Sequence, residues 1–114
     1  MTVFRNFEVE ALHLILRDVF GPEQLAAIVA FDGEAICEYT GCGYFLTVRH
    51  PMLPEKRSTL DRPIVMGEAG DVTCGFLVFL GGGELMLECH TWDTVDVPEN
   101  FRDLEVRVYV VGPQ

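Results

Sequence analysis

The stretch TCGFLVFLGGGELMLECHTW, residues 73–92, carries the clearest structural signal in the chain. Two apolar-rich runs of strand length lie on either side of Gly81-Gly82-Gly83, and glycine readily adopts the positive φ angles of tight hairpin turns. Apolar residues alternate with other residues in the second run, as they do in a half-buried strand. The stretch therefore predicts an antiparallel β-hairpin.

The first strand of this hairpin is apolar on both faces. Successive side chains of a strand point to opposite faces, so Phe76, Val78 and Leu80 share one face while Leu77 and Phe79 share the other. An apolar second face needs a cover, and a homodimer is the simplest one. The sequence therefore predicts self-association.

The second strand separates a core face from a mixed face. Leu85, Leu87 and Cys89 share the face that we predict to lie in the core. The opposite face carries one apolar residue, Met86, among polar and aromatic ones: Glu84, Glu88, His90 and Trp92.

An amphipathic helix is predicted over residues 7–20, before the hairpin. Its apolar residues recur at spacings of three and four. Asn6 is a suitable N-cap, and Gly21-Pro22 is a typical helix end. The predicted stripe consists of Val9, Leu12, Leu16, Val19 and Phe20.

Residues 23–31 leave helix and strand both open. Pro22 can start a further helix, whereas Asp32-Gly33 is a hairpin-turn dipeptide that would make residues 28–31 a strand. We predict strands over residues 34–40 and 44–50, with a turn or bulge at residues 40–43. In that turn Gly41 and Gly43 allow positive φ or a close approach of strands.

The second half of the chain is predicted to be mostly strand. Residues 51–63 hold three of the six prolines and should form an exposed loop. A half-buried last strand is indicated by alternation over residues 104–110. Together the patterns predict an α+β fold: an N-terminal amphipathic helix packed on a curved antiparallel sheet of five or six strands. Residues 1–114 are read as a single domain.

Composition excludes several classes of protein. The 114 residues carry a net charge of −10, which is the wrong sign for a protein that grips nucleic acid through its phosphates. No apolar run is long enough to span a bilayer, so no membrane partner is expected. Because no secretory signal is recognisable, we expect a soluble cytoplasmic protein with reduced thiols. The four cysteines, at positions 37, 42, 74 and 89, are expected to be buried as small hydrophobic residues.

The Glu88-Cys89-His90 run is the most suggestive local cluster for chemistry. Cys89 and His90 point to opposite faces of a strand and cannot act together. Glu88 and His90 do share a face, about 7 Å apart along the strand and beside Trp92. They form either a carboxylate-oriented histidine site or a solvated polar patch. No catalytic, metal or cofactor motif is present, so none of these groups is predicted.

Charge is concentrated in residues 84–105. Seven acidic residues there oppose Arg102 alone, which gives a local charge of −6. Such a stripe, interleaved with apolar residues, attracts basic proteins and speeds their association. The alternative is that the acids only keep the protein soluble. Four of the eight basic residues lie in or just before the 51–63 loop, so the two patches can also meet across a dimer: Arg49, Lys56, Arg57 and Arg62.

These observations give two hypotheses of function. The first is a non-enzymatic, immunity- or inhibitor-like module that binds a basic protein. The second is a small-ligand-binding or enzymatic domain with a pocket near Glu88, His90 and Trp92, joined by Tyr44 and Arg49. The predicted binding residues are Glu88, His90, Trp92, Asp93 and Asp96.

Two segments together resemble a known family. TGCGYFLTV (40–48) and GFLVFLGGGELMLECHTW (75–92), followed by a proline and an acidic stretch, are similar to motifs of a family of small uncharacterised bacterial proteins. The resemblance spans residues 34–99. The chain departs from it at Cys89-His90, where a small residue and an aromatic one are expected. The family has no established activity, so the resemblance implies an α+β fold and no catalytic residues.

Overall fold

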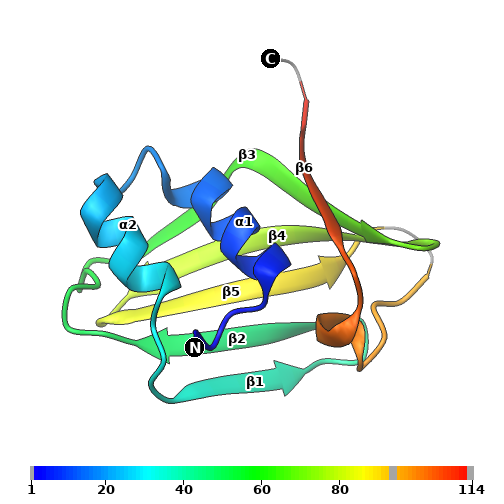
Figure 1. Cartoon of the computed structure of the whole chain (residues 1–114), viewed down its shortest axis with the longest axis horizontal. Helices are drawn as coiled ribbons and strands as arrows, with labels where there is room; N and C mark the ends of the chain where they lie inside the picture. Colours follow the sequence, from blue (N-terminus) through cyan, green and yellow to red (C-terminus); the bar gives the residue numbers. More distant parts are fainter. Residues whose placement is uncertain (1, 93–94, 113–114) are drawn as a thin grey trace.

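The protein is described by a computed structural model that covers residues 2–92 and 95–112. Within these residues two α-helices precede the first strand, and a 3-10 turn precedes the last (Figure 1). The elements are α1 (Asn6–Leu16), α2 (Pro22–Val29), β1 (Ala35–Tyr39), β2 (Gly43–Arg49), β3 (Ser58–Ala69), β4 (Val72–Gly81), β5 (Glu84–Thr91), η1 (Phe101–Asp103) and β6 (Arg107–Val111).

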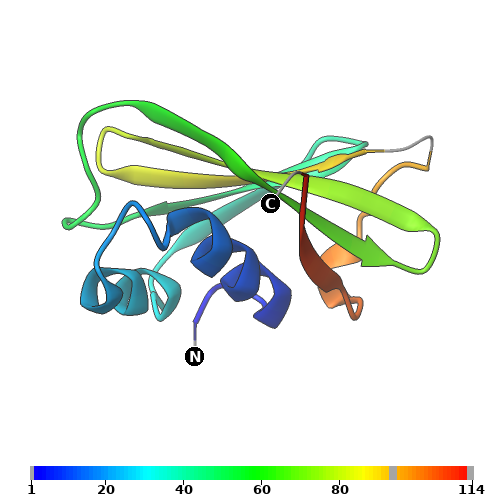
Figure 2. The ribbon, with the colours of Figure 1, turned by 90° about the horizontal axis from the view of Figure 1, so that it is seen from above.

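The strands form one open antiparallel sheet of six strands in the order β1-β2-β5-β4-β3-β6. α1 contacts β3, β4 and β6, and Figure 2 shows α1, α2 and η1 all on the same side of the sheet. The predicted α+β architecture is therefore confirmed, with six strands. Its central hairpin, β4–β5, is the one predicted from residues 73–92.

α1 is shorter than predicted and buries a different stripe. Its N-cap is Arg5 rather than Asn6, because the Glu8 side chain accepts a hydrogen bond of 2.7 Å from the Arg5 backbone N–H. The helix ends at Leu16, where turn hydrogen bonds lead the chain toward α2. Val19 consequently lies outside the helix and is exposed. The buried residues are Phe7, Glu8, Ala11, Leu12, Ile15 and Leu16.

Of residues 23–31, whose structure the sequence left open, residues 23–29 belong to a helix, α2. Pro22 stands in the first turn of α2, where its missing N–H costs nothing. Leu25 and Ile28, three residues apart, are both buried under the helix. Asp32-Gly33 therefore links α2 to β1 and does not form the hairpin turn that its sequence suggested.

The prediction of a loop over the whole of residues 51–63 was wrong at its second half. β3 already begins at Ser58 and pairs with β4 along most of its length. The register shifts between Leu60 and Val65, and Pro63 lies within that irregularity. A proline has no N–H to give to a sheet ladder, so an interruption of the ladder is where a strand tolerates it.

The core lies between the helices and one face of the sheet. The two faces predicted for the hairpin are confirmed, since Phe76, Val78 and Leu80 of β4 and Leu85, Leu87 and Cys89 of β5 are all buried in it. The last strand begins at Arg107, later than predicted. Leu104 is exposed and directly follows η1, so residues 104–106 lie between η1 and β6 and not in the strand.

The expectation that all four cysteines are buried is correct for two of them and wrong for the other two. Cys74 and Cys89 are buried, whereas Cys37 and Cys42 are exposed, and all four are free thiols. Cys37 lies on an edge strand and Cys42 in the β1–β2 turn, two positions that the helices do not cover.

The thiols should therefore react at different rates. In the native protein we expect iodoacetamide to modify Cys42 first and Cys37 more slowly, because burial raises the pKa of the Cys37 thiol and reduces its thiolate form. Cys74 and Cys89 should react only in concentrated urea. Peptide mass spectrometry over time measures the four rates, and native labelling of Cys89 as fast as that of Cys42 would contradict the core packing.

Candidate functional site

Within the described residues, no helix covers the face of the sheet turned away from α1 and α2, the upper side in Figure 2. The strand register places side chains of β2, β4 and β5 there that are apolar and only half-buried. Phe79 stands directly opposite Met86. We call Phe45, Leu77, Phe79 and Met86 the open-face cluster.

Three of the predicted binding residues lie together on this face. The Glu88 carboxylate is 3.8 Å from Nδ1 of His90, and the His90 and Trp92 rings are 5.9 Å apart. Glu88 stands between Phe45 and Leu77 in the register. The nitrogen Nδ1 of His90 has no hydrogen-bond partner within the described part of the chain. The Glu88–His90 pair is thus long for a hydrogen bond and sits on an open face.

Gly75 provides the space under these rings. A Cβ atom at this position would lie 2.8 Å from Nε2 of His90 and 3.0 Å from Cε3 of Trp92. The absence of a side chain at Gly75 therefore makes room for these two aromatic rings. Gly43 is likewise required by a close approach of strands, because a Cβ there would lie 2.0 Å from the Cys89 carbonyl oxygen.

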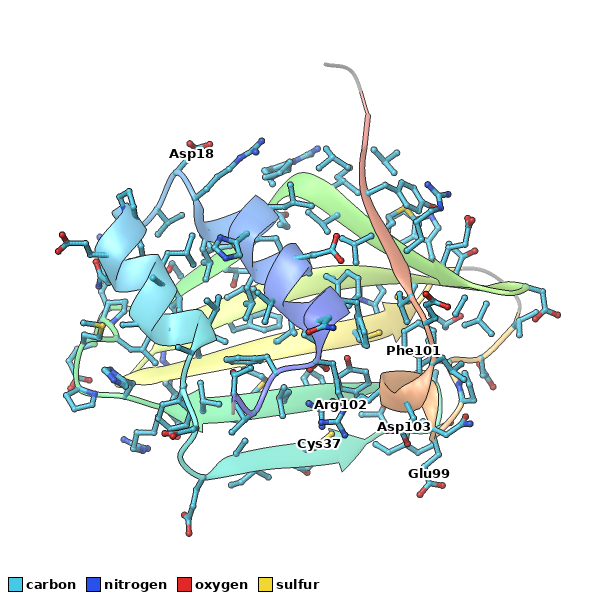
Figure 3. All side chains as sticks on the ribbon, in the orientation of Figure 1. Asp18, Cys37, Glu99, Phe101, Arg102 and Asp103 are labelled. Carbon is cyan, nitrogen blue, oxygen red and sulfur yellow. The ribbon has the colours of Figure 1, made fainter. Side chains whose placement is uncertain are left out.

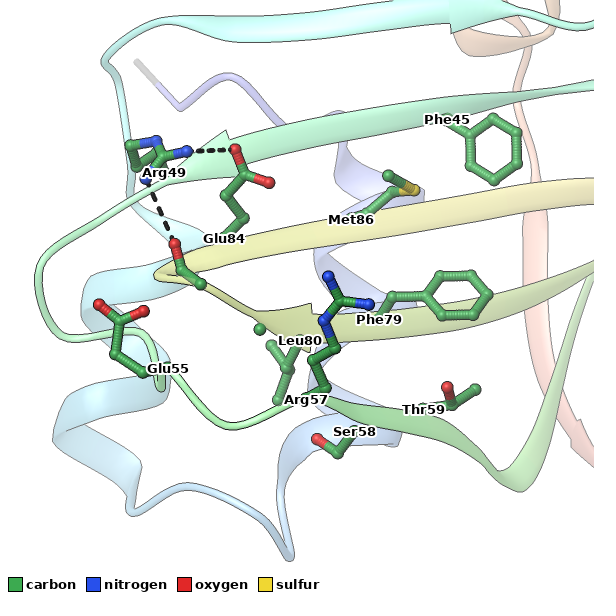
Figure 4. Close-up of a pocket in the computed structure, with 12 residues that line it drawn as sticks. Phe45, Arg49, Glu55, Arg57, Ser58, Thr59, Phe79, Leu80, Glu84 and Met86 are labelled. Carbon is green, nitrogen blue, oxygen red and sulfur yellow. Dashed lines mark hydrogen bonds and ion pairs between the residues drawn. The ribbon is translucent and has the colours of Figure 1, made fainter.

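A groove of about 660 Å³ lies on the same face but at its opposite end, where β4 turns into β5 (Figure 4). Phe45, Phe79 and Met86 line it together with two arginines. Arg49 donates a hydrogen bond of 2.7 Å to Glu84. Glu88, His90 and Trp92 are not among the residues that line this groove.

Arg57 is the second arginine of the groove and has no hydrogen-bond or ion-pair partner among the described residues. Figure 4 shows its guanidinium turned away from Glu55. An unpaired cation next to an apolar cluster is a natural place for an incoming carboxylate.

The acidic residues of segment 84–105 are divided between the two sides of the sheet. Glu84 and Glu88 lie on the open face, whereas Asp103 belongs to η1 on the helix side and lies 3.5 Å from Arg5. Asp93 falls outside the described residues. We call the exposed carboxylates that follow it the acidic loop: Asp96, Glu99, Asp103 and Glu105.

Arg102 is the only basic residue of that segment, and it points inward. Its Nε and Nη2 atoms donate hydrogen bonds of 2.8 Å to the two oxygens of Glu8, which is fully buried. Tyr44 donates a further hydrogen bond to Glu8. Figure 3 shows Arg102 directed toward β1 and Glu99 directed outward. The one positive charge in the segment is therefore used inside the protein and does not offset the acidic loop.

This cluster also changes the ionisation of its members. Burial, and then the nearby Glu8 charge, raise the pKa of Tyr44 far above its ordinary value, so its hydroxyl stays protonated. The hydrogen bonds to Glu8 raise the pKa of Arg102. The three side chains together form a fixed ion pair and hydrogen bond that join α1, β2 and η1.

Two further contacts hold the acidic loop in place. Phe101 is completely buried and packs edge-on against Phe7, with ring centres 5.7 Å apart. The Tyr39 hydroxyl donates a hydrogen bond of 2.8 Å to the carbonyl of Val97, which is also buried. The loop is thus anchored from within and presents its carboxylates outward.

The sequence interpretation missed the role of Glu8. Glu8 precedes Leu12 and Leu16 at a spacing of four and so lies on the buried stripe of α1. That spacing was the sequence signal that could have shown Glu8 to be buried. Nothing in the sequence indicated that Arg102, 94 residues away, is its partner.

Metal and membrane sites receive no support from the described residues. No three His, Cys, Asp or Glu side chains gather there as metal ligands would. Neither described helix has the length and apolar character needed to cross a membrane.

The chain was compared with protein-family models, with curated proteins and with solved structures. None of them matches. The resemblance over residues 34–99 therefore stays a prediction, and the functional argument rests on the surfaces described above.

Proposed function

We propose that the protein is a non-enzymatic interaction module, immunity- or inhibitor-like in its mode of action, that binds a basic partner protein through the acidic loop. The observation that carries this proposal is the inward position of Arg102, so that among the described residues the only ion pair of the loop carboxylates is that of Asp103 with Arg5. A patch of one sign raises the association rate of an oppositely charged partner.

Exposed apolar side chains near these carboxylates support the same proposal. Val95 and Leu104, which are next to Asp96 and Asp103 in the sequence, are exposed. Trp92, which precedes them, is exposed for 56% of its surface. Tryptophan is enriched among the residues that dominate binding energy at protein interfaces. Charge supplies steering here, and these side chains supply area that a partner can bury.

The small-ligand alternative has weaker support. A site near Glu88 and His90 would need a concavity there, whereas the groove lies beside Arg49 and Arg57 at the other end of the face. The 3.8 Å between Glu88 and His90 is also longer than the hydrogen bond of a carboxylate-oriented histidine. Both observations favour the interaction module.

The proposal is tested by capture of partners from cell lysate at low and high salt. For the loop variant Asp96→Asn/Glu99→Gln/Glu105→Gln, the amount of basic partner captured should fall by about tenfold or more relative to the unchanged protein. The control variant Glu10→Gln/Asp18→Asn/Glu23→Gln removes the same charge from the helix layer and should retain as much as the unchanged protein.

Three results would refute this proposal: no basic protein is retained, salt does not release it, or the two variants behave alike. The control residues are all exposed, so both variants are expected to fold normally. Circular dichroism of both proteins verifies this before the capture.

We further propose that the open face is covered by a second copy of the chain. The open-face cluster is continuous across three neighbouring strands, and a sheet left apolar on both faces is stable in water only when each face is covered. The two exposed thiols, Cys37 and Cys42, favour action in the reducing cytoplasm.

A further inference from the structure

We infer that the groove at the β4–β5 turn binds an aliphatic monocarboxylate, with its carboxylate on Arg57 and its chain along Phe79 and Met86. A medium-chain fatty acid is the representative of this class. The inference uses only the groove and the residues that line it. It therefore rests neither on the acidic loop nor on the homodimer proposed above.

The groove exists because one row of side chains on the open face contains a glycine. The strand register places Arg49, Glu84 and Gly81 side by side on β2, β5 and β4. Arg57 comes next in this row, since a Cβ atom on Gly81 would lie 3.2 Å from its Cα atom. Gly81 contributes no side chain, so the row is open between Glu84 and Arg57.

The turn between β4 and β5 holds Arg57 in position. The aliphatic stem of Arg57 lies over Gly81, where a Cβ atom would come within 2.8 Å of its Cγ atom. The backbone N–H of Gly82 donates a hydrogen bond of 3.0 Å to the carbonyl of Glu55, two residues before Arg57. The backbone and the stem are thus fixed, while the guanidinium has no partner among the described residues.

The charges around the groove favour a ligand with a single negative charge. Arg49 and Glu84 neutralise each other through a hydrogen bond of 2.7 Å, and Figure 4 shows Arg57 turned away from Glu55. The guanidinium of Arg57 presents parallel N–H donors that match the two oxygens of a carboxylate. A doubly charged phosphate would bring more negative charge near Glu55 and Glu84, so the monoanion is favoured.

Thr59 supplies a second hydrogen-bond donor on the same side of the groove. It lies two residues beyond Arg57 and directly opposite Phe79, so its side chain is on the open face. Its hydroxyl has no hydrogen-bond partner within residues 2–92 and 95–112. Arg57 and Thr59 thus place free donors on the β3 side of the groove, where we expect the carboxylate.

The rest of the groove is an apolar wall. Phe79 of β4 stands opposite Met86 of β5, and Phe45 of β2 is the diagonal neighbour of Met86. The three side chains therefore lead across the sheet, away from Arg57. From β3 to β2 is three strand spacings, about 14 Å, which an extended medium-chain fatty acid spans. The volume of about 660 Å³ is within the usual range for small-molecule sites.

A peptide fits the groove less well than an aliphatic chain. β4 and β5 are inner strands of the sheet, and each pairs with a strand on both sides. They leave little free main chain at the groove to bind the N–H and C=O groups of a peptide. Placing such groups against apolar side chains without partners costs free energy, and an aliphatic chain has none.

Titration with decanoate, followed by two-dimensional amide NMR, tests the inference. The unchanged protein should bind decanoate saturably, with a dissociation constant below about 1 mM, and the signals that move should belong to residues of the groove. Decanamide and decylammonium, which carry the same chain without the negative charge, should bind at least about tenfold more weakly. Octanoate, two methylene groups shorter, should bind about fivefold more weakly.

Two pairs of matched variants locate the carboxylate and the chain. Arg57→Gln should weaken decanoate binding at least about tenfold, whereas Lys56→Gln, which removes the same charge outside the groove, should change it less than about twofold. Phe79→Ala should weaken binding about fivefold or more. Leu77→Ala, on the same face but outside the groove, should have little effect. The amide spectrum of each variant verifies its fold.

Four results would overturn the inference: no saturable binding of decanoate below about 1 mM, decanamide or decylammonium binding as tightly as decanoate, equal behaviour of Arg57→Gln and Lys56→Gln, or shifts that gather at residues 88–92. A short peptide that ends in leucine is titrated alongside. Tighter binding of that peptide than of decanoate would assign the groove to a protein C-terminus instead.

The homodimer is tested separately, by sedimentation equilibrium. Twice the monomer mass of 12.8 kDa at about 100 μM supports it, and a monomeric mass refutes it. Phe79 and Met86 would also be covered by a second copy, so the decanoate titration is repeated at about tenfold lower protein concentration, where less of the protein is paired. None of these results bears on the acidic loop, which the capture experiment measures.

Discussion

Replacing Arg102 by methionine is expected to lower the free energy of unfolding by about 3–5 kcal/mol, the usual cost of removing one member of a buried ion pair. The substitution leaves the fully buried Glu8 carboxylate with only the Tyr44 hydroxyl and the Arg5 backbone N–H as hydrogen-bond donors among the described residues. Urea unfolding followed by circular dichroism measures the change.

Two companion variants separate loss of the ion pair from loss of a side chain. Arg107→Met breaks an ion pair at the surface, with Glu68, and should leave the urea midpoint nearly unchanged. Glu8→Leu/Arg102→Met removes both buried charges and should recover much of the loss. If Arg102→Met were as harmless as Arg107→Met, the Glu8–Arg102 pair would not be the anchor described here.

Phe101→Ala is expected to cost about 3–5 kcal/mol as well, because the change empties a fully buried site. Phe101 packs against Phe7 of α1, so its truncation also removes the contact that holds η1 against α1. The expected effect on the acidic loop is a loss of fixed position, and hence weaker capture of a basic partner.

Leu104→Ala is the control for this second substitution. Leu104 is 36% exposed and lies in the same segment, so its truncation should cost less than about 1 kcal/mol. Thermal unfolding of the two variants is the measurement. Equal losses would mean that the loop is not anchored through the aromatic contact.

Much of the sheet was predictable because one local rule specifies it. Alternation around Gly81-Gly82-Gly83 predicted β4, β5 and their faces, and no distant residue was needed for that inference. β3 was not predictable to the same extent. Pro63 argues against a strand when it is read locally, and only pairing with β4 on both sides of an irregularity keeps Ser58–Ala69 together.

The helical half shows the limits of turn signals. Asp32-Gly33 predicts a hairpin turn wherever strands flank it, but Leu25 and Ile28 find buried positions only if the preceding residues are helical. Tertiary packing therefore overrode the local turn preference. The first helix likewise stops at Leu16 because the chain must turn there to bring α2 onto the sheet.

For the candidate site, composition indicated the sign of the charge but not its arrangement. A local charge of −6 over residues 84–105 treats Arg102 as a surface cation, whereas it is bound to Glu8 inside the protein. The same count treats Glu84 as a free acid, although Arg49 holds it. Contacts between residues far apart in the sequence decide which acidic residues of segment 84–105 form the acidic loop, and the sequence alone does not show those contacts.

The association rate of a captured partner, measured as a function of salt, tests the central claim most directly. The rate should fall by about tenfold or more between low and high ionic strength for the unchanged protein and for Glu10→Gln/Asp18→Asn/Glu23→Gln. It should depend much less on salt for Asp96→Asn/Glu99→Gln/Glu105→Gln. A rate that is independent of salt, or that is the same for the loop variant, would contradict steering by the acidic loop.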